Sequence, residues 1–129
     1  MTGSKVLLDT NVVIEIFKNN QPILDALDLY SYNINTVTLG ELQVGIYRVD
    51  NRVQHEMLLN DFLSMSDVLT IDETTASLYG EISAELYKKG KPIPTNDIWI
   101  AASAKQHGLP LFTKDKHFLQ IDGMDLQLF

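Results

Sequence analysis

Four acidic residues stand where one apolar pattern of the sequence gives way to another. Asp9 ends the run KVLLD, Glu41 lies in TLGELQVG, Asp97 lies in PTNDIWIAASA, and Asp115 lies in FTKDKHF. A carboxylate beside a buried segment costs free energy unless a backbone donor, a cation or a metal ion compensates it. Gathered in one place, such groups could hold a divalent cation, and that cation would support phosphoryl chemistry.

Asp9 and Glu41 each have a structural explanation as well. Asp9 can cap a helix that begins near Asn11, because its side chain can accept the free backbone donors of the first turn. The segment TLGE, residues 38–41, fits a capping box in which Thr38 and Glu41 bond to each other's backbone amides. Helix capping alone therefore explains both acids.

Asp97 and Asp115 also fit ordinary local roles. Asn96 can cap the helix that contains Asp97, and an acid in the first helical turn is favoured by the helix dipole. Asp115 follows an apolar strand, where aspartate is a common turn former. Taken one at a time, neither residue requires a functional site.

The elements that position these acids alternate between strand and helix. This order predicts an α/β fold with a mostly parallel sheet of four to five strands and helices on both faces. Apolar runs predict strands at residues 5–9, 68–71, 110–113 and 126–129, with a weaker one at 33–35. Helical patterns cover residues 12–18, 23–29, 39–47, 53–64, 74–89 and 98–107.

Within such a sheet the four acids can share one edge. Three of them follow a strand or begin a helix, Glu41 is expected in a helix's first turn, and ligands of open α/β sheets bind at the carboxyl ends of the strands. Carboxylates that converge repel one another, and divalent metal relieves that repulsion. Oxygen ligands without histidine or cysteine favour Mg²⁺ or Mn²⁺ over zinc.

Length and composition limit the class of protein. The chain has 129 residues, no cysteine and a net charge of −7, so we expect one domain without disulfides. No apolar run suits a signal peptide or a membrane span, which predicts a soluble protein that stays in the cytoplasm. The acidic charge argues against a broad electrostatic grip on nucleic acid, so any polyanionic substrate needs cations or local basic groups.

The motifs together resemble a known family. LLDTN (7–11), TLGELQVG (38–45) and NDIWIAASAKQHGLPLFTKD (96–115), followed by HF, are similar to the motifs of PIN-domain ribonucleases of the VapC toxin type. That family shows an early Asp-Thr-Asn, a helical Glu, an Asp before Ile-Ala-Ala and a Thr-x-Asp-x-x-Phe. The resemblance implies a single PIN-like domain over residues 1–129.

The resemblance also implies a function and its residues. It implies that the chain is a Mg²⁺-dependent endoribonuclease, with Mn²⁺ as a possible substitute, in which Asp9, Glu41, Asp97 and Asp115 are both catalytic residues and metal ligands. Thr10, Asn11 and Thr113 are expected to support them, and Lys114 and Lys116 to bind RNA phosphates. The implied partners are RNA, a neutralising antitoxin protein and a second copy of the chain.

Three alternatives stay open at this point. The chain could be a PIN nuclease of RNA processing or decay without a toxin role. It could cleave RNA without metal, with His107 and His117 as base and acid. From a different class, it could be a phospho-acceptor receiver domain, which needs an acceptor aspartate at the end of a middle strand, and here VLTI leads into Asp72 and Glu73.

Overall fold

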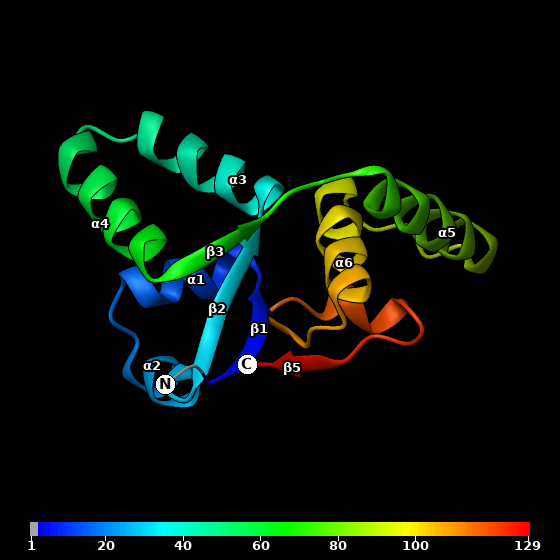
Figure 1. Ribbon diagram of the computed structural model, residues 1–129. Coiled ribbons are helices and arrows are strands. Elements are labelled where there is room, and N and C mark those ends of the chain that lie inside the picture. The colour runs from blue at the N-terminus through cyan, green and yellow to red at the C-terminus, as the bar shows by residue number, and fades with distance from the viewer. Residues whose placement is uncertain (1–2) are drawn as a thin grey trace.

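A five-stranded parallel sheet forms the centre of the protein. The computed structural model describes residues 3–129, and its strands are β1 (Ser4–Leu8), β2 (Tyr30–Asn35), β3 (Ser66–Leu69), β4 (Leu111–Thr113) and β5 (Leu126–Leu128). The strand order is β3-β2-β1-β4-β5, and each neighbouring pair is parallel. The predicted α/β class with a parallel sheet is confirmed (Figure 1).

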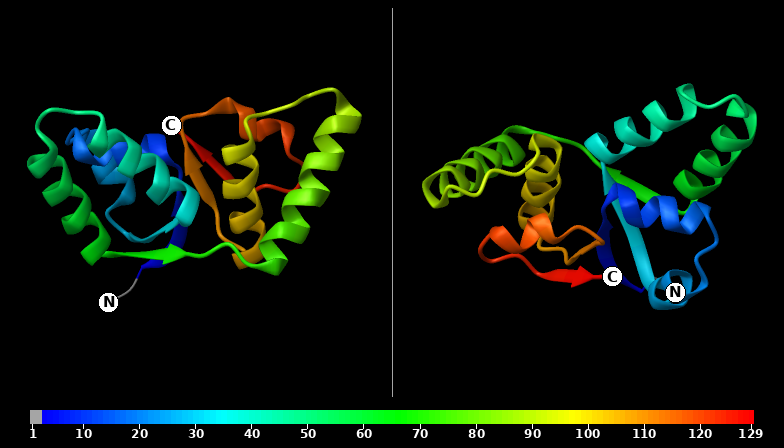
Figure 2. Two further views of the ribbon diagram at one scale, coloured as in Figure 1. Left: turned by 90° about the horizontal axis from the view of Figure 1, so that it is seen from above. Right: turned by 180° about the vertical axis from the view of Figure 1, so that it is seen from behind.

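Helices cover both sides of this sheet. They are α1 (Thr10–Phe17), α2 (Gln21–Leu27), α3 (Thr36–Tyr47), α4 (Arg52–Ser64), α5 (Glu73–Lys89), α6 (Thr95–His107) and the short 3-10 helix η1 (Lys116–Gln120). Helices α1–α4 gather on one side, and α5, α6 and η1 on the other (Figure 2). Within residues 3–129, no helix combines the length and the apolar character needed to cross a membrane.

Each predicted helix exists and begins one to three residues earlier than expected. Except at Thr74, the predicted starts were placed at the first apolar residue, whereas each helix begins on the residues that precede it. The strand expected at residues 68–71 lies at Ser66–Leu69 instead, on an edge of the sheet with Asp67 and Val68 exposed. An edge strand is covered less than a central one, so its apolar pattern locates it less accurately.

Strand β1 separates two hydrophobic cores. Val6 and Leu8 pack with α1–α4, whereas Leu7 packs with α5 and α6. All three side chains are fully buried, as expected for alternate residues of a strand that is covered on both faces. Burying each contributes roughly 1.5–3 kcal/mol, so the end of β1 is firmly placed.

The strand order predicts a crevice at the carboxyl ends of β1 and β4. From β1 the chain continues on one side to β2 and β3, while β4 and β5 lie on the other side. In α/β sheets, the point at which the order reverses leaves a crevice that binds ligands, because neighbouring connections diverge there. Asp9 follows β1 and Asp115 lies two residues beyond β4, so two predicted site residues border this crevice.

Asn35 fixes the start of α3 beside the crevice. It is fully buried, and its Oδ1 accepts hydrogen bonds from the backbone N–H of Val37 (2.7 Å) and Thr38 (3.1 Å). Its Nδ2 donates to Ser103 Oγ (3.0 Å) and to the Trp99 carbonyl (3.3 Å) on α6. One side chain thus caps α3 and joins it to α6 across the sheet edge.

This cap makes the predicted TLGE capping box wrong. Thr38 is not the N-cap: it is buried in the first turn of α3, and its hydroxyl has no hydrogen-bond partner within residues 3–129. Glu41 lies in the second turn rather than the first. Capping therefore does not explain Glu41.

Replacing Asn35 should destabilise the fold far more than replacing another N-cap asparagine. Asn35→Ala removes a cap and leaves buried donors without partners, so we expect a loss of about 2–4 kcal/mol in the free energy of unfolding. Asn51, the N-cap of α4, is exposed and makes no capping hydrogen bond. Asn51→Ala should therefore change stability by less than about 0.5 kcal/mol. Urea unfolding measures both, and equal losses would contradict this assignment.

Candidate active site

Asp9 lies at the centre of a hydrogen-bond network that joins β1, α1 and β4. It is 4% exposed, and its Oδ1 accepts from the Thr10 backbone N–H (2.8 Å), which confirms that it caps α1. Its Oδ2 accepts from Asn11 Nδ2 (3.1 Å) and Thr113 Oγ1 (2.7 Å). Three donors therefore hold this carboxylate at the crevice.

The environment of Asp9 disfavours its charge. Burial raises its pKa to about 6, and the nearby charges of Asp97 and Glu41 act in the same direction. The hydrogen bonds from Thr113 and Thr10 oppose these effects without cancelling them. Without a cation, the carboxylates at this crevice thus carry an electrostatic cost.

Glu41 is held by a direct contact with α1. Thr10 Oγ1 donates to Glu41 Oε1 at 2.6 Å, although the two residues are 31 positions apart in sequence. Thr10 thus orients the acid of α3 toward the acid that precedes α1. The structure thus places the Thr10 side chain in contact with Glu41.

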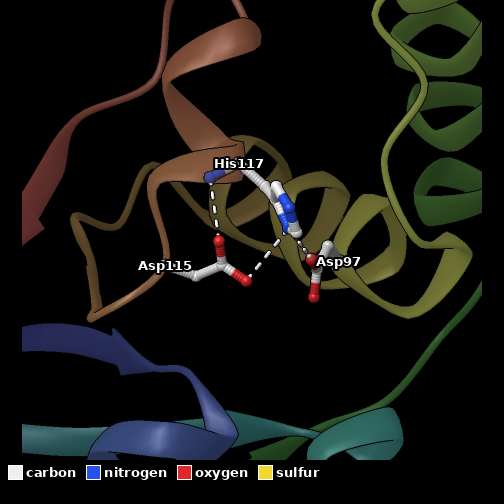
Figure 3. Close-up of side chains that lie close together, drawn as sticks. All are labelled: Asp97, Asp115 and His117. Carbon is white, nitrogen blue, oxygen red and sulfur yellow. Dashed lines mark hydrogen bonds and ion pairs between the residues drawn. The ribbon is translucent and has the colours of Figure 1, made fainter.

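Asp97 and Asp115 face each other through His117. His117 Nδ1 lies 3.1 Å from Asp115 Oδ2 and 3.4 Å from Asp97 Oδ2, and Figure 3 shows the imidazole between the two carboxylates. One ligand atom from each of the three residues lies within 4.8 Å of the other two. Asp9 and Glu41 lie outside this tightest group but interact electrostatically with Asp97.

Asp97 lies in the first turn of α6, as expected, where the helix dipole favours an acid. Burial and the charge of Asp115 raise its pKa, whereas His117 lowers it. The expected cap by Asn96 is wrong, because α6 begins at Thr95 and its N-cap is Pro94, with no side-chain hydrogen bond. Proline fixes the backbone angle before the helix and so starts α6 without that bond.

Thr113 and Asn11 hold the loop that carries Asp115. The Thr113 hydroxyl donates to Asp9 and accepts from the Asp115 backbone N–H (2.9 Å), so it links the two acids directly. Asn11 Oδ1 accepts from the Lys114 backbone N–H (3.0 Å). Both predicted supporting residues therefore connect α1 and β4 to the loop.

The two lysines predicted to bind phosphate differ in their surroundings. Lys114 Nζ pairs with Glu15 at 3.1 Å, so phosphate would have to displace that carboxylate. Hydrogen bonds from Asn20 and Lys114 also hold the pKa of Glu15 below its usual value. Lys116 is exposed, and within residues 3–129 it makes no ion pair.

Two of the alternative functions do not fit this geometry. His107 is the last residue of α6, whereas His117 contacts Asp97 in the first turn of that helix. About 15 Å of helix separates Asp97 from His107, so the two histidines lie at opposite ends of α6. They cannot act as base and acid on one phosphate. The receiver alternative needs its acceptor on a middle strand, but β3, which precedes Asp72, is an edge strand.

His117 was not predicted as part of the acidic site, and the structure places it there. Its backbone N–H donates to Asp115 Oδ1 (2.9 Å) at the start of η1, which turns the side chain back toward the acids. The spacing Asp-x-His after a strand was the available signal, because aspartate commonly bonds to the backbone two residues later.

The donors at the crevice fit a divalent cation. Carboxylate oxygens are the preferred ligands of hard cations, and a cation would relieve the repulsion that raises the pKa of both Asp9 and Asp97. An acidic site where the strand order of a parallel α/β sheet reverses suits a metal-dependent hydrolytic enzyme.

Comparison with known proteins identifies the family. Residues 6–124 match the PIN domain family, and the chain belongs to it. Ribonuclease VapC2 of Haemophilus influenzae is 34% identical over 116 residues, which are 86% of each chain. The tRNA(fMet)-specific endonuclease VapC of Shigella flexneri is 31% identical over 93% of this chain and 94% of its own. The crystal structure of DNA-bound VapBC from Salmonella typhimurium matches with a TM-score of 0.90 and 31% identity, over 96% and 97% of the two chains.

Asp9 should make the metal-free protein less stable as the pH rises. Its pKa is about 6 when folded and 3.8 as a free acid, so the folded state binds the proton more tightly. Its contribution is therefore most favourable below about pH 4 and is lost as the pH rises through about 6. In chelator, the stability of Asp9→Asn relative to the wild type should rise between pH 4 and 7 by roughly 3 kcal/mol at most. Denaturant unfolding at several pH values measures this, and a constant difference would contradict it.

Proposed function

We propose that this protein is a metal-dependent endoribonuclease that hydrolyses RNA phosphodiester bonds as the toxin of a toxin–antitoxin pair. The convergence of Asp9, Glu41, Asp97 and Asp115 at the crevice beside β1 and β4 carries the proposal. Relatives named ribonuclease and tRNA-specific endonuclease support RNA as the substrate. We further propose that the chain forms one domain and acts in the cytoplasm.

The four acids are the proposed metal ligands, with Mg²⁺ as the expected ion and Mn²⁺ as a substitute. A divalent ion bound there supplies activation of water and stabilisation of the charge that develops in phosphodiester cleavage. Thr10 holds Glu41, and Asn11 and Thr113 hold Asp9 and the loop of Asp115. These contacts fix the acids before substrate arrives, so little reorganisation is needed.

Lys116 and Lys114 are the proposed phosphate contacts on the substrate side. Lys116 is exposed one residue after Asp115. Lys114 is half-exposed, and RNA phosphate can exchange with the Glu15 carboxylate as its partner. Local lysines of this kind offset the acidic net charge close to the reacting phosphate.

An apolar groove next to the site is the proposed position of the antitoxin. It has a volume of about 300 Å³ and is lined on α1, α3 and α4 by residues that include Ile14, Leu42, Gly45 and Leu58, with Glu41 also in its lining. The solved VapBC structure from Salmonella typhimurium supports such a partner. An amphipathic helix in this groove could extend a basic residue to Glu41 and so block the site. A homodimer is also expected, as in the resembling family.

Removing single site charges should abolish cleavage without weakening the metal-free fold. Asp97→Asn and Glu41→Gln should each lower RNA cleavage more than about 100-fold, since even residues that only orient metal ligands contribute about 10- to 100-fold. The melting temperature in EDTA should stay unchanged or rise, because unfavourable charge is removed. Both variants should lose the stabilisation that millimolar Mg²⁺ gives the wild type.

Three observations would overturn the assignment. Wild-type cleavage that survives EDTA would remove the metal from the reaction. If the variants have a lower melting temperature in EDTA and are stabilised by Mg²⁺ as much as the wild type, Asp97 and Glu41 have structural roles and do not bind the metal. We expect products with a 5′ phosphate and a 3′ hydroxyl; a 2′,3′-cyclic phosphate would contradict attack by water, because it forms when the ribose 2′-hydroxyl attacks instead.

Filling the groove should prevent neutralisation by the antitoxin. A side-chain carbon added at Gly45 meets no atom within 4 Å, so Gly45→Leu should fold, gain up to about 1 kcal/mol in helix propensity and occupy the groove. The cognate antitoxin should then bind at least about 30-fold more weakly, as when an interface hot spot is lost. Gly80→Leu on α5 is the matched control, since it is equally open but lies outside the groove. Equal antitoxin affinity for both variants, measured by calorimetry, would reject the groove.

A further inference from the structure

We propose that His117 is a nitrogen ligand of the divalent ion at this site and makes the site select Mn²⁺ over Mg²⁺. The inference rests on the metal site of the proposed function and adds to it a residue and a metal preference. The sequence predicted an oxygen-only site, whereas the structure places an imidazole among the carboxylates.

The distances suit shared coordination. His117 Nδ1 lies 3.1 Å and 3.4 Å from one oxygen of each acid, Asp115 and Asp97. Neighbouring ligands of an octahedral ion with bonds of about 2.1 Å are themselves about 3 Å apart. The nitrogen is thus separated from each of the two carboxylate oxygens by nearly the distance between adjacent ligands of one ion, and one ligand atom from each residue lies within 4.8 Å of the others (Figure 3).

The backbone holds His117 in this position. Its own N–H donates to Asp115 Oδ1 at 2.9 Å, and the next residue, Phe118, is fully buried against α6 and its neighbours. Because η1 is anchored on both counts, the imidazole is presented to the acids by a fixed element rather than by a free loop. Such support is typical of side chains that bind metal.

Donor chemistry gives this contact a consequence for metal choice. Mg²⁺ strongly prefers oxygen ligands and keeps several waters, whereas first-row transition ions accept imidazole nitrogen readily. A nitrogen beside two carboxylates therefore adds affinity for Mn²⁺ and adds little for Mg²⁺. The opposing explanation is that the His117 imidazole occupies the cation position and only hydrogen-bonds to the two carboxylates. In that case Mn²⁺ and Mg²⁺ must both displace it.

Electron spin-echo spectroscopy of Mn²⁺ bound to the full chain tests the coordination directly. The wild type should show ¹⁴N coupling from a bound imidazole, and His117→Gln should lose it. His107→Gln is the matched control, because His107 is exposed at the far end of α6 and should leave the coupling intact. Absence of ¹⁴N coupling in the wild type, or its persistence in His117→Gln, would overturn the proposal.

Calorimetric titration tests the selectivity. His117→Gln should bind Mn²⁺ at least about tenfold more weakly, while its affinity for Mg²⁺ changes less than about threefold. An equal change for both ions, or tighter binding of both, would overturn the proposal and show that His117 only competes with the cation. Melting curves in EDTA check that the variant is folded.

The same titrations distinguish the failure of this proposal from the failure of the proposed metal-dependent nuclease site. If Asp97→Asn abolishes metal binding and His117→Gln leaves it unchanged, His117 is rejected as a ligand. The proposed nuclease site then still stands. Failure of the wild type to bind either ion removes the site, and His117 with it. Tenfold weaker Mn²⁺ binding in His117→Gln, together with lost ¹⁴N coupling, supports both.

Discussion

The burial of one carboxylate, Asp9, is the constraint on which the arrangement around the crevice depends. An acid that is 4% exposed and close to two other acids is tolerated only because three hydrogen bonds compensate part of its cost. Those donors come from both residues that open α1 and from the end of β4. Solvating Asp9 and bringing α1 and β4 together are therefore the same physical event. The remaining cost is what a divalent cation would relieve, so stability without metal is traded for affinity with it.

The strand order turns that local solution into a site. Because β1 lies between β2 and β4, the segments that follow all three strands meet at the same edge. Asn35 ends β2 and bonds to α6, which brings the helix of Glu41 close to the helix of Asp97. Away from the strand ends, α3 and α6 pack into the two different cores on opposite faces of the sheet, so the sheet lies between them. The acids thus approach one another only at the strand ends, where the sheet stops.

Residue patterns predicted the elements and the four acids, and they failed where a distant partner decides the structure. Alternating apolar runs identified the helices and the parallel class because they reflect burial along a single element. The TLGE capping box was wrong because the helix starts earlier, at the cap formed by Asn35. Asn35 is held there by a hydrogen bond to Ser103, which lies 68 residues further along the sequence. Lys114 was expected to be open for phosphate, and a residue of α1, Glu15, holds it. His117 was considered only together with His107 for the same reason, since nothing local reveals that Asp97 lies opposite.

A local structural role and metal binding were alternative explanations for Asp9 and Asp115, and the geometry makes them compatible. A carboxylate offers about four lone-pair directions, and Asp9 uses three of them for hydrogen bonds, which leaves one on Oδ1. Asp115 caps η1 with Oδ1 while Oδ2 faces His117. A cap also orients its acid, because the backbone donor fixes one oxygen and thereby the direction of the other. The ends of strands and the beginnings of helices therefore suit metal ligands: the backbone donors that stabilise the acid also aim its free electron pair.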